Sequence, residues 1–296
     1  MIITKTRLRI SFAGGGTDLA AKYSSTELVE RPEDIQHPLI REALLYSATA
    51  TPLEITSFAD IPAEGSGLGS SSAFCVGLVH ALTVLAGKHH SSSKLAEMAC
   101  TIEIDRLKGP IGKQDQYASA VGGFNYLKFH SDGTVFSEAI PLSRPARQEL
   151  EKSLLLFYTG VTRSAKSILT EQRDNTHEHG QTRTALLGVR RLAEELKSAL
   201  CRHDLTSFGD ILHKGWLLKK QFAGGVSNSF IDEACDAAMA PGALGGKLLG
   251  AGGCGFLLVF YASPERQAAV CQAPARLRRV NFSFDVQGTR IAHLGT

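Results

Sequence analysis

The sequence predicts an α+β protein of two domains, and three observations lead to this prediction. Strand-like and helix-like segments follow one another in mixed order along the chain. The 296 residues are 43% hydrophobic and 21% charged, a composition that suits a folded chain with room for two cores. The pattern changes near Arg144–Glu151, and we therefore expect one domain at 1–147 and a second at 148–296.

Hydrophobic periodicity predicts the elements of the first domain. Thr6–Phe12 alternates polar and apolar side chains, as a half-buried strand does. Ser71–Ala86 is apolar on nearly all faces, which predicts a buried helix that begins directly after a glycine cluster. The other elements expected here are helices at Pro38–Tyr46, Ser93–Arg106 and Gly112–Ala120, a strand at Leu53–Phe58, and a strand pair at Phe124–Phe129 and Thr134–Ile140.

The second domain reads as a few strands among long helices. Leu192 and Leu196 lie on one face of the longest predicted helix. Strands are expected at Leu154–Tyr158, Phe256–Tyr261 and Asn281–Val286, and helices at Ser164–Arg173, Thr184–Leu200, Leu205–Lys220, Asn228–Met239 and Pro264–Leu277.

Composition and charge exclude several classes of protein. The longest apolar runs are far shorter than the ~20 residues that cross a bilayer, and charges interrupt the N-terminal residues, so we expect neither a membrane span nor a secretion signal. The six cysteines form no C-x-x-C pair and the ten histidines show no ligand spacing, which favours free thiols in the cytoplasm over a zinc site. With a net charge of only +3 and scattered basic residues, the chain is not expected to bind nucleic acid.

The strongest chemical signal is the glycine cluster before the buried helix. The run P-A-E-G-S-G-L-G-S-S-S-A occupies Pro62–Ala73. A glycine-rich turn lets backbone N–H groups converge, and the helix N-terminus adds positive charge, so together they can hold a polyanion such as a nucleoside triphosphate. Capping alone also places glycine and serine before a helix. Three glycines and three serines exceed that need, so we favour phosphate binding.

Two other glycine-rich stretches do not support familiar nucleotide motifs. No G-x-x-x-x-G-K-[ST] occurs, because the stretch Gly242–Leu248 has the wrong spacing and lacks the hydroxyl. Gly250–Gly255 matches G-x-G-x-x-G, but a predicted strand follows it rather than a helix. We therefore do not expect a dinucleotide-binding domain.

Three motifs together resemble those of the GHMP small-molecule kinases. The segment R-I-S-F-A-G-G-G-T-D (Arg9–Asp18) is similar to the first motif of this family, Pro62–Ala73 to the second, and G-G-K-L-L-G-A-G-G-C-G-F (Gly245–Phe256) to the third. Within the family, the first motif and G-K-Q-D-Q-Y-A (Gly112–Ala118) most resemble the D-glycero-D-manno-heptose 7-phosphate kinases.

The resemblance implies a fold and an activity. The N-terminal ATP-binding domain would be α+β with a left-handed βαβ-type unit, the C-terminal domain would be ferredoxin-like, and ATP and a sugar phosphate would bind in the cleft between them. The implied reaction is ATP-dependent phosphorylation of the anomeric hydroxyl of a heptose 7-phosphate, with Mg²⁺. A kinase of fucose or galactose, and a GHMP-fold protein that binds without catalysis, are the alternatives. A homodimer is left open.

The resemblance also implies roles for matching positions. Asp115 matches the catalytic base and Arg9 the arginine that pairs with it. Glu103 matches the Mg²⁺-binding glutamate, with Ser71 as its hydroxyl partner. The implied ATP-binding set is Gly65, Gly67, Leu68, Gly69, Ser70, Ser71 and Ser72, and the substrate-binding set is Gly15, Gly16, Thr17, Asp18, Gly252 and Gly253.

Each of these residues also has a structural interpretation. Asp115 could be a helix-surface acid, and Glu103 a solvated one beside Asp105. Arg9 alternates with Arg7 on the predicted strand, so that one of the two should face solvent. A binding protein without activity would not need to keep both Asp115 and Glu103, so their presence favours an enzyme.

The acceptor's phosphate needs cations that the nucleotide loop does not supply. Arg163 and Lys166 are three residues apart and would point the same way at a helix start, and we take them as substrate-binding candidates. Solvated helix residues are the alternative. The other basic candidates are Arg173, Lys219 and Lys220.

The chain departs from the family pattern in one place. Only positions 19–61 lie between Asp18 and Pro62, several dozen fewer than the family has, where further strands of the N-terminal domain are expected. Their loss predicts an uncovered sheet edge or apolar face. A true deletion and a sequence that joins two stretches of a longer chain are the two explanations. We favour the second, which an intact mass above 31.7 kDa would support.

Overall fold

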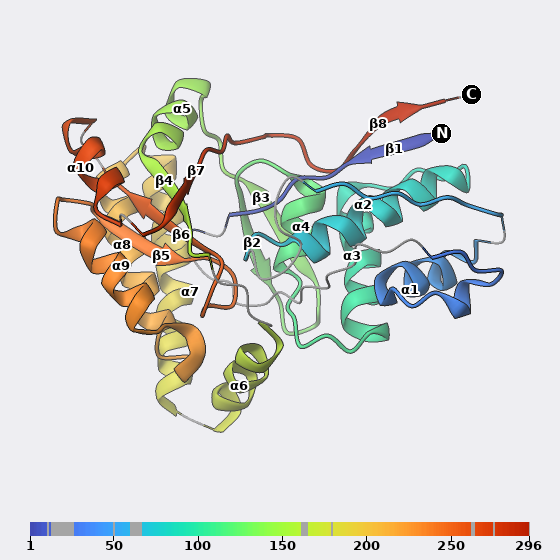
Figure 1. The fold of residues 1–296 in the computed structure, drawn as a ribbon, viewed down its shortest axis with the longest axis horizontal. Coiled ribbons are helices and arrows are strands. Elements are labelled where there is room, and N and C mark those ends of the chain that lie inside the picture. The colour runs from blue at the N-terminus through green and yellow to red at the C-terminus, as the bar shows by residue number, and fades with distance from the viewer. Residues whose placement is uncertain are drawn as a thin grey trace.

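The computed structural model describes residues 1–10, 12, 27–49, 51–59, 67–160, 165–178, 180–261, 264–274 and 276–295. In Figure 1 the elements gather in two groups, with α1–α4 on one side and β4–β7 with α7–α10 on the other. No helix within these ranges is long and apolar enough to cross a membrane.

Helices form the core of the N-terminal group. They are α1 (Pro38–Ser47), α2 (Ser70–Leu85), α3 (Ser92–Cys100) and α4 (Gln114–Val121). The apolar residues of α2 are buried around most of the helix, as its sequence predicts, since α1, α3 and α4 all pack against it. β1 approaches α2 closely at Gly77, which has no side chain. There the Thr4 hydroxyl donates to the Gly77 carbonyl at 3.0 Å.

Two small antiparallel sheets complete this group. β2 (Asn125–Phe129) and β3 (Val135–Ala139) form the expected hairpin. β1 (Ile2–Lys5) pairs with β8 (Arg290–Leu294), so the two ends of the chain lie side by side in Figure 1. The residues of β8, which the sequence assigned to the C-terminal domain, therefore pack with the N-terminal group.

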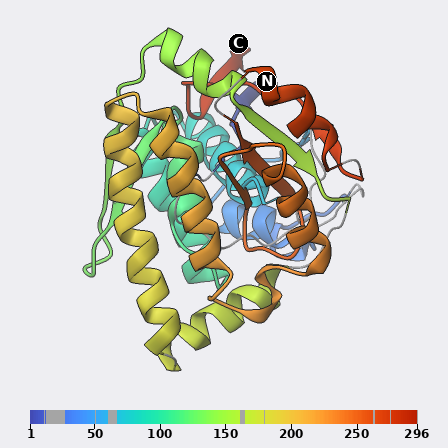
Figure 2. The same ribbon diagram turned by 90° about the vertical axis from the view of Figure 1, so that its left-hand side faces the viewer.

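The C-terminal group is built on a four-stranded antiparallel sheet of order β5-β6-β4-β7. Its strands are β5 (Gly245–Leu248), β6 (Phe256–Phe260), β4 (Leu154–Tyr158) and β7 (Arg278–Val280), and its helices are α5 (Arg144–Lys152), α6 (Ala165–Glu178), α7 (Gly180–Cys201), α8 (Leu205–Lys219), α9 (Ser229–Met239) and α10 (Gln267–Gln272). Figure 2 shows α7 and α8 running side by side, in front of the N-terminal helices. Both faces of β6 are buried, which explains its unbroken apolar sequence.

Three expected strands do not form as the sequence suggested. Residues 53–58 lie in no sheet, residues 6–10 continue from β1 without a sheet partner, and residues 281–286 lie between β7 and β8. Alternation of side chains predicts which faces a strand would bury, but a strand forms only where a second one pairs with it. The helix expected at Pro264–Leu277 also ends early, at Gln272.

A cavity of about 1310 Å³ opens beside residues 6–10, with which no strand of the described ranges pairs. It lies between this segment, the β2–β3 hairpin and α7. Apolar side chains line it at high exposure, among them Phe58 at 93% and Leu187 at 57%. The uncovered face expected from the short spacing between Asp18 and Pro62 stays a prediction, because parts of that segment lie outside the described residues.

Candidate active site

The turn before α2 has the geometry of a phosphate-binding loop. Gly67 and Gly69 adopt positive φ angles of 68° and 73°, which only glycine adopts readily. Gly69 is the N-cap residue and no side chain caps the helix. The serines that follow are therefore not needed for capping, and the first N–H groups of α2 keep their positive potential for an anion.

Arg9 and Asp115 form a buried ion pair beside this loop. The guanidinium donates from Nε to Oδ1 at 2.6 Å and from Nη2 to Oδ2 at 2.7 Å, while Nη1 donates to the Gly67 carbonyl at 3.1 Å. Arg9 is 6% exposed and Asp115 3% exposed. These values rule out a solvated acid at Asp115 and show that Arg9 is the inward arginine, whereas Arg7 pairs with Asp285 at the surface.

A second carboxylate, that of Glu103, lies beside the N-terminus of α2. Its Oε1 accepts from the Ser71 hydroxyl at 2.7 Å and its Oε2 from the Gln116 amide at 2.6 Å. Burial raises the pKa of the Glu103 carboxyl, the hydrogen bonds from Ser71 and Gln116 lower it, and the charge of Asp115 raises it further. Glu103 is thus a buried group held at the phosphate loop by hydrogen bonds.

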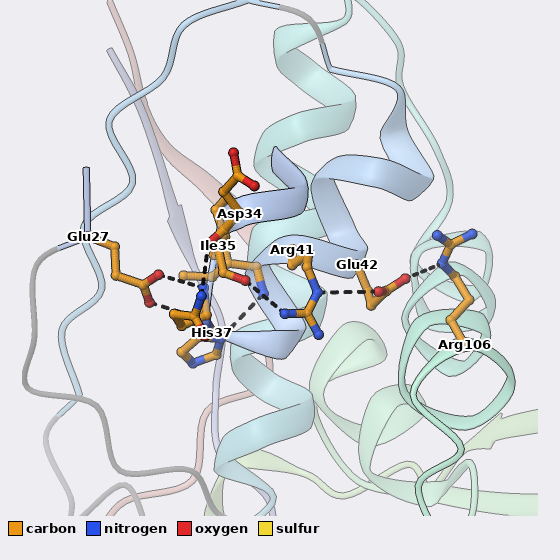
Figure 3. Close-up of polar contacts among 9 residues, drawn as sticks. Glu27, Asp34, Ile35, His37, Arg41, Glu42 and Arg106 are labelled. Carbon is orange, nitrogen blue, oxygen red and sulfur yellow. Dashed lines mark hydrogen bonds and ion pairs between the residues drawn. The ribbon is translucent and has the colours of Figure 1, made fainter. Parts of the chain in front are cut away.

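A π-helical turn places Glu103. The helix expected at Ser93–Arg106 changes after Cys100 into the π-helix η2 (Thr101–Arg106), a wider turn that is frequent at functional sites. Figure 3 shows how α1 holds its end, since Arg106 Nε pairs with Glu42 Oε2 at 2.9 Å. Arg41, the neighbour of Glu42, donates to the Ile35 carbonyl at 2.8 Å, which ties the segment before α1 to the same network.

The third glycine motif packs directly on the phosphate loop. A Cβ on Gly250 would lie 2.4 Å from the Gly67 Cα, so the two backbones touch. Lys219, at the end of α8, donates to the Gly250 carbonyl. Lys247 of β5 donates to the Phe12 carbonyl at 3.4 Å. The first, second and third motifs therefore meet at one place.

Comparison with known protein families identifies this arrangement. The model of the GHMP kinases N-terminal domain matches residues 38–123, and the model of the GHMP kinases C-terminal domain matches residues 196–276. Together these ranges cover more than half of the chain. The chain belongs to the GHMP kinase family. Kinases of this family use ATP, typically with Mg²⁺.

Individual relatives of this GHMP kinase include sugar and mevalonate kinases. A D-glycero-alpha-D-manno-heptose 7-phosphate kinase of Campylobacter jejuni is 29% identical over 287 residues, 95% of this chain and 84% of the relative. A mevalonate kinase of Thermococcus onnurineus is 30% identical over 79% of this chain and 66% of the relative. A bifunctional fucokinase/GDP-fucose pyrophosphorylase of Arabidopsis thaliana is 29% identical over 88% of this chain but only 25% of its own length.

Solved structures agree with the fold. A D-glycero-D-manno-heptose 1-phosphate kinase from Bacteroides thetaiotaomicron superposes with a TM-score of 0.73 at 23% identity over the full length of both chains. A putative sugar kinase from Campylobacter jejuni gives a TM-score of 0.73 at 27% identity, over 98% of this chain and 97% of that one. The two-domain α+β fold of the GHMP kinases is thus the fold of this chain.

The GHMP kinase brings many of the expected site residues together. Arg9, Asp115, Glu103 and the stretch 67–72 form one cluster. Gly252 and Gly253 pack elsewhere, against Val226, whose carbonyl would meet a Cβ on Gly252 at 2.6 Å. The expected residues Gly15, Gly16, Thr17, Asp18, Gly65 and Arg163 lie outside the described residues, as does the side chain of Lys166 on α6. Their roles stay predictions.

The sequence alone did not single out two members of the site. Gln116 is fully buried beside Glu103, and its Oε1 has no hydrogen-bond partner in the described part of the chain. Lys247 is 3% exposed, and burial together with the charges of Lys219 and Arg9 holds its pKa well below the usual range. The segment Gly112–Ala118 that supports the family resemblance contains Gln116, but nothing in it indicated that this amide would hold Glu103.

The donor set near Ser71 fits Mg²⁺. This ion is usually held by one or two carboxylates and by phosphate oxygens of the substrate rather than by a dedicated cage. Glu103 and the Ser71 hydroxyl supply such oxygens side by side, and the orphaned Oε1 of Gln116 is a further acceptor for a bound water. Across the described ranges no group of three or more His, Cys, Asp or Glu side chains gathers that could form a cage.

Proposed function

We propose that this GHMP kinase transfers the γ-phosphoryl group of ATP to the anomeric hydroxyl of a heptose 7-phosphate. The product would be a heptose 1,7-bisphosphate, for the synthesis of nucleotide-activated heptose. A relative from Campylobacter jejuni, matched over 95% of this chain and 84% of its own length, is named a heptose 7-phosphate kinase, which supports this acceptor. The observation that carries the chemistry is the buried Arg9–Asp115 pair, hydrogen-bonded to Gly67 of the phosphate loop.

Asp115 acts as the general base. Each of its oxygens accepts a hydrogen bond from Arg9, and a carboxylate oxygen can accept more than one hydrogen bond, so the acceptor's hydroxyl can donate to the same group. The carboxylate orients that hydroxyl toward the γ-phosphorus and takes its proton late in the transfer. The cation of Arg9 keeps Asp115 ionised and offsets negative charge that builds on the transferred group.

The loop and the second carboxylate hold the nucleotide. Backbone N–H groups of residues 67–72 and the start of α2 bind the phosphates, and Gly65 extends this set. Ser71 and Glu103 would hold Mg²⁺, which when bound neutralises charge on the β- and γ-phosphates. Gln116 fixes the orientation of Glu103 through the hydrogen bond to Oε2.

The acceptor is held by the first and third motifs. Thr17 and Asp18, with Gly15 and Gly16, bind sugar hydroxyls. Gly252 and Gly253 let the backbone approach the ligands, and Arg163 and Lys166 bind the 7-phosphate. We place the enzyme in the cytoplasm, with the N- and C-terminal domains divided near residues 147 and 148, and a homodimer is left open.

The two alternatives make different demands on the acceptor. Fucokinase- and galactokinase-like enzymes act on sugars without a phosphate, and a binding protein needs no base. The burial of both Asp115 and Glu103 at the loop favours an enzyme. ATP turnover measured against a panel of hexoses, heptoses and sugar 7-phosphates separates the three: we expect turnover with a heptose 7-phosphate and little with its phosphate-free form.

A further inference from the structure

Lys219 is a buried cation that the proposed mechanism does not use. It lies at the last turn of α8 and is only 3% exposed, although lysine is almost never fully buried unless it is paired. Its ammonium donates to the carbonyl of Gly250, in the turn that follows β5. A charge-assisted hydrogen bond in a buried place is strong and fixes the position of its acceptor.

The Gly250 turn leads directly to the phosphate loop. A Cβ on Gly67 would lie 2.8 Å from the Leu249 carbonyl oxygen, and one on Gly250 would lie 2.4 Å from the Gly67 Cα. Gly67 in turn accepts the hydrogen bond from Arg9, whose guanidinium holds Asp115. Lys219 is therefore connected to Arg9 and Asp115 through two backbone contacts, one at Gly250 and one at Gly67.

Charge at this place points in the same direction. Lys247 is equally buried, and the charges of Lys219 and Arg9 both act on it. Three cations from three separate segments thus lie within electrostatic reach of one another beneath the loop. Clustered buried cations repel each other, and an anion with several charges bound above them relieves that repulsion.

We propose that Lys219 is a positioning residue for the phosphate loop: it holds the Gly250 turn against Gly67 and adds positive charge on the side of the loop where a triphosphate would bind. This inference rests on the proposed role of residues 67–72 in binding phosphates and not on the identity of the acceptor. The inference predicts that loss of Lys219 weakens the binding of the triphosphate but not that of the adenosine part of the nucleotide.

The test compares two nucleotides on three proteins. Titration calorimetry with Mg²⁺ measures the affinity of wild type, Lys219→Met and Lys214→Met for a non-hydrolysable ATP analogue and for AMP. Lys214 lies on the same helix but is exposed and pairs with Asp210, so it is the matched control. We expect Lys219→Met to bind the analogue at least tenfold more weakly and AMP as wild type does, with Lys214→Met unchanged.

Further variants guard against a simple loss of folding. Lys219→Arg keeps the charge and should restore most of the analogue affinity, and Lys219→Gln keeps a neutral donor and should restore less. Equal loss of analogue and AMP affinity in Lys219→Met and Lys219→Gln, or wild-type affinity in both, would overturn the inference. Wild type that binds neither nucleotide would overturn the phosphate-loop assignment as well, whereas an inactive acceptor panel with intact binding would concern only the proposed acceptor.

Discussion

At the scale of single residues, the site depends on a carboxylate that stays charged while buried. Removing a charge from water is unfavourable by several kcal/mol, and a bidentate arginine is the partner that compensates it best. Asp115 and Arg9 have this geometry. The same burial that makes the pair costly removes competing water from the hydroxyl that Asp115 would deprotonate.

Replacing the base tests this role directly. Asp115→Asn keeps the shape of the side chain but cannot accept a proton, so we expect kcat to fall by ~10²–10⁴ while the affinity for ATP stays nearly unchanged. Asp105→Asn, at an exposed position on the preceding turn, is the control and should keep wild-type kcat. Steady-state kinetics with both variants decide the matter. If Asp115→Asn keeps wild-type kcat, Asp115 is not the base.

Glu103 should matter for the metal rather than for the proton. In Glu103→Gln the hydrogen bond from Ser71 can persist, but the charge that attracts Mg²⁺ is lost. We expect the Mg²⁺ concentration for half-maximal activity to rise about tenfold or more. Loss even of a residue that only orients a metal ligand typically lowers metal affinity by about 10–100-fold. Glu97→Gln, an exposed residue paired with Lys94, serves as the control. An unchanged Mg²⁺ dependence would contradict the assignment.

Lys247 should make stability depend on pH. Its pKa in the fold lies below that of the unfolded chain, so the unfolded state binds more protons and stability rises with pH up to about the ordinary lysine value. Lys247→Met removes this penalty, worth about 1.4 kcal/mol for each pKa unit. The variant should therefore melt at a higher temperature than wild type at pH 7. Thermal melts of both proteins should show that the difference in melting temperature is smaller at pH 10 than at pH 7. A difference that stays constant or becomes larger at pH 10 argues against a lowered pKa.

At the scale of elements, the turns that contain Gly67 and Gly250 pack directly against each other. Gly250→Ala should lower the free energy of unfolding for two reasons: the positive φ of 69° is unfavourable for alanine, and the added Cβ would clash with Gly67. Gly87 has nearly the same φ, 68°, but nothing within 4 Å of an added Cβ. Gly87→Ala should therefore lose only about 1–2 kcal/mol, and Gly250→Ala clearly more. Denaturant unfolding of the two variants measures the difference, and equal losses would mean that the contact with Gly67 is not tight.

Helices were easier to predict from the sequence than strands. The buried helix after the glycine cluster, α2, was predicted from its apolar sequence, and α3 is capped by Ser91, whose hydroxyl accepts from the Lys94 N–H. The helix α5 (Arg144–Lys152) was not predicted, although Ser143 caps it in the same way. The strand expected at Leu53–Phe58 depended on a partner that periodicity cannot reveal. The π-helical turn at Thr101–Arg106 was also invisible, because one extra residue in a turn leaves the apolar pattern almost unchanged.

Contacts between distant residues of the site could not be predicted from the residues alone. Ser71 and Glu103 are 32 residues apart, and their 2.7 Å contact could be anticipated only through the resemblance to a family. The contact between Gly67 and Gly250 joins two motifs that look alike as turns, and no property of either shows that they meet. Gln116 was missed because amide residues next to a catalytic acid are common on surfaces as well.

At the scale of the whole molecule, the two ends of the chain come together. Its first and last strands pair, and the Thr6 hydroxyl lies 2.9 Å from that of Thr289. Arg9, which holds Asp115, follows β1 by only a few residues. On the opposite side of residues 6–10 the large cavity leaves apolar side chains such as Phe58 exposed.

The most direct test of the account is the product of the reaction. Wild-type enzyme with ATP, Mg²⁺ and a heptose 7-phosphate is followed by ³¹P NMR. We expect a second sugar-phosphate signal, coupled to the anomeric proton, to appear as ATP is converted to ADP, and Asp115→Asn to produce it ~10²–10⁴ times more slowly. Phosphate transferred to another hydroxyl, or equal turnover of the phosphate-free heptose, would contradict the proposed acceptor, and an Asp115→Asn variant as fast as wild type would contradict the mechanism.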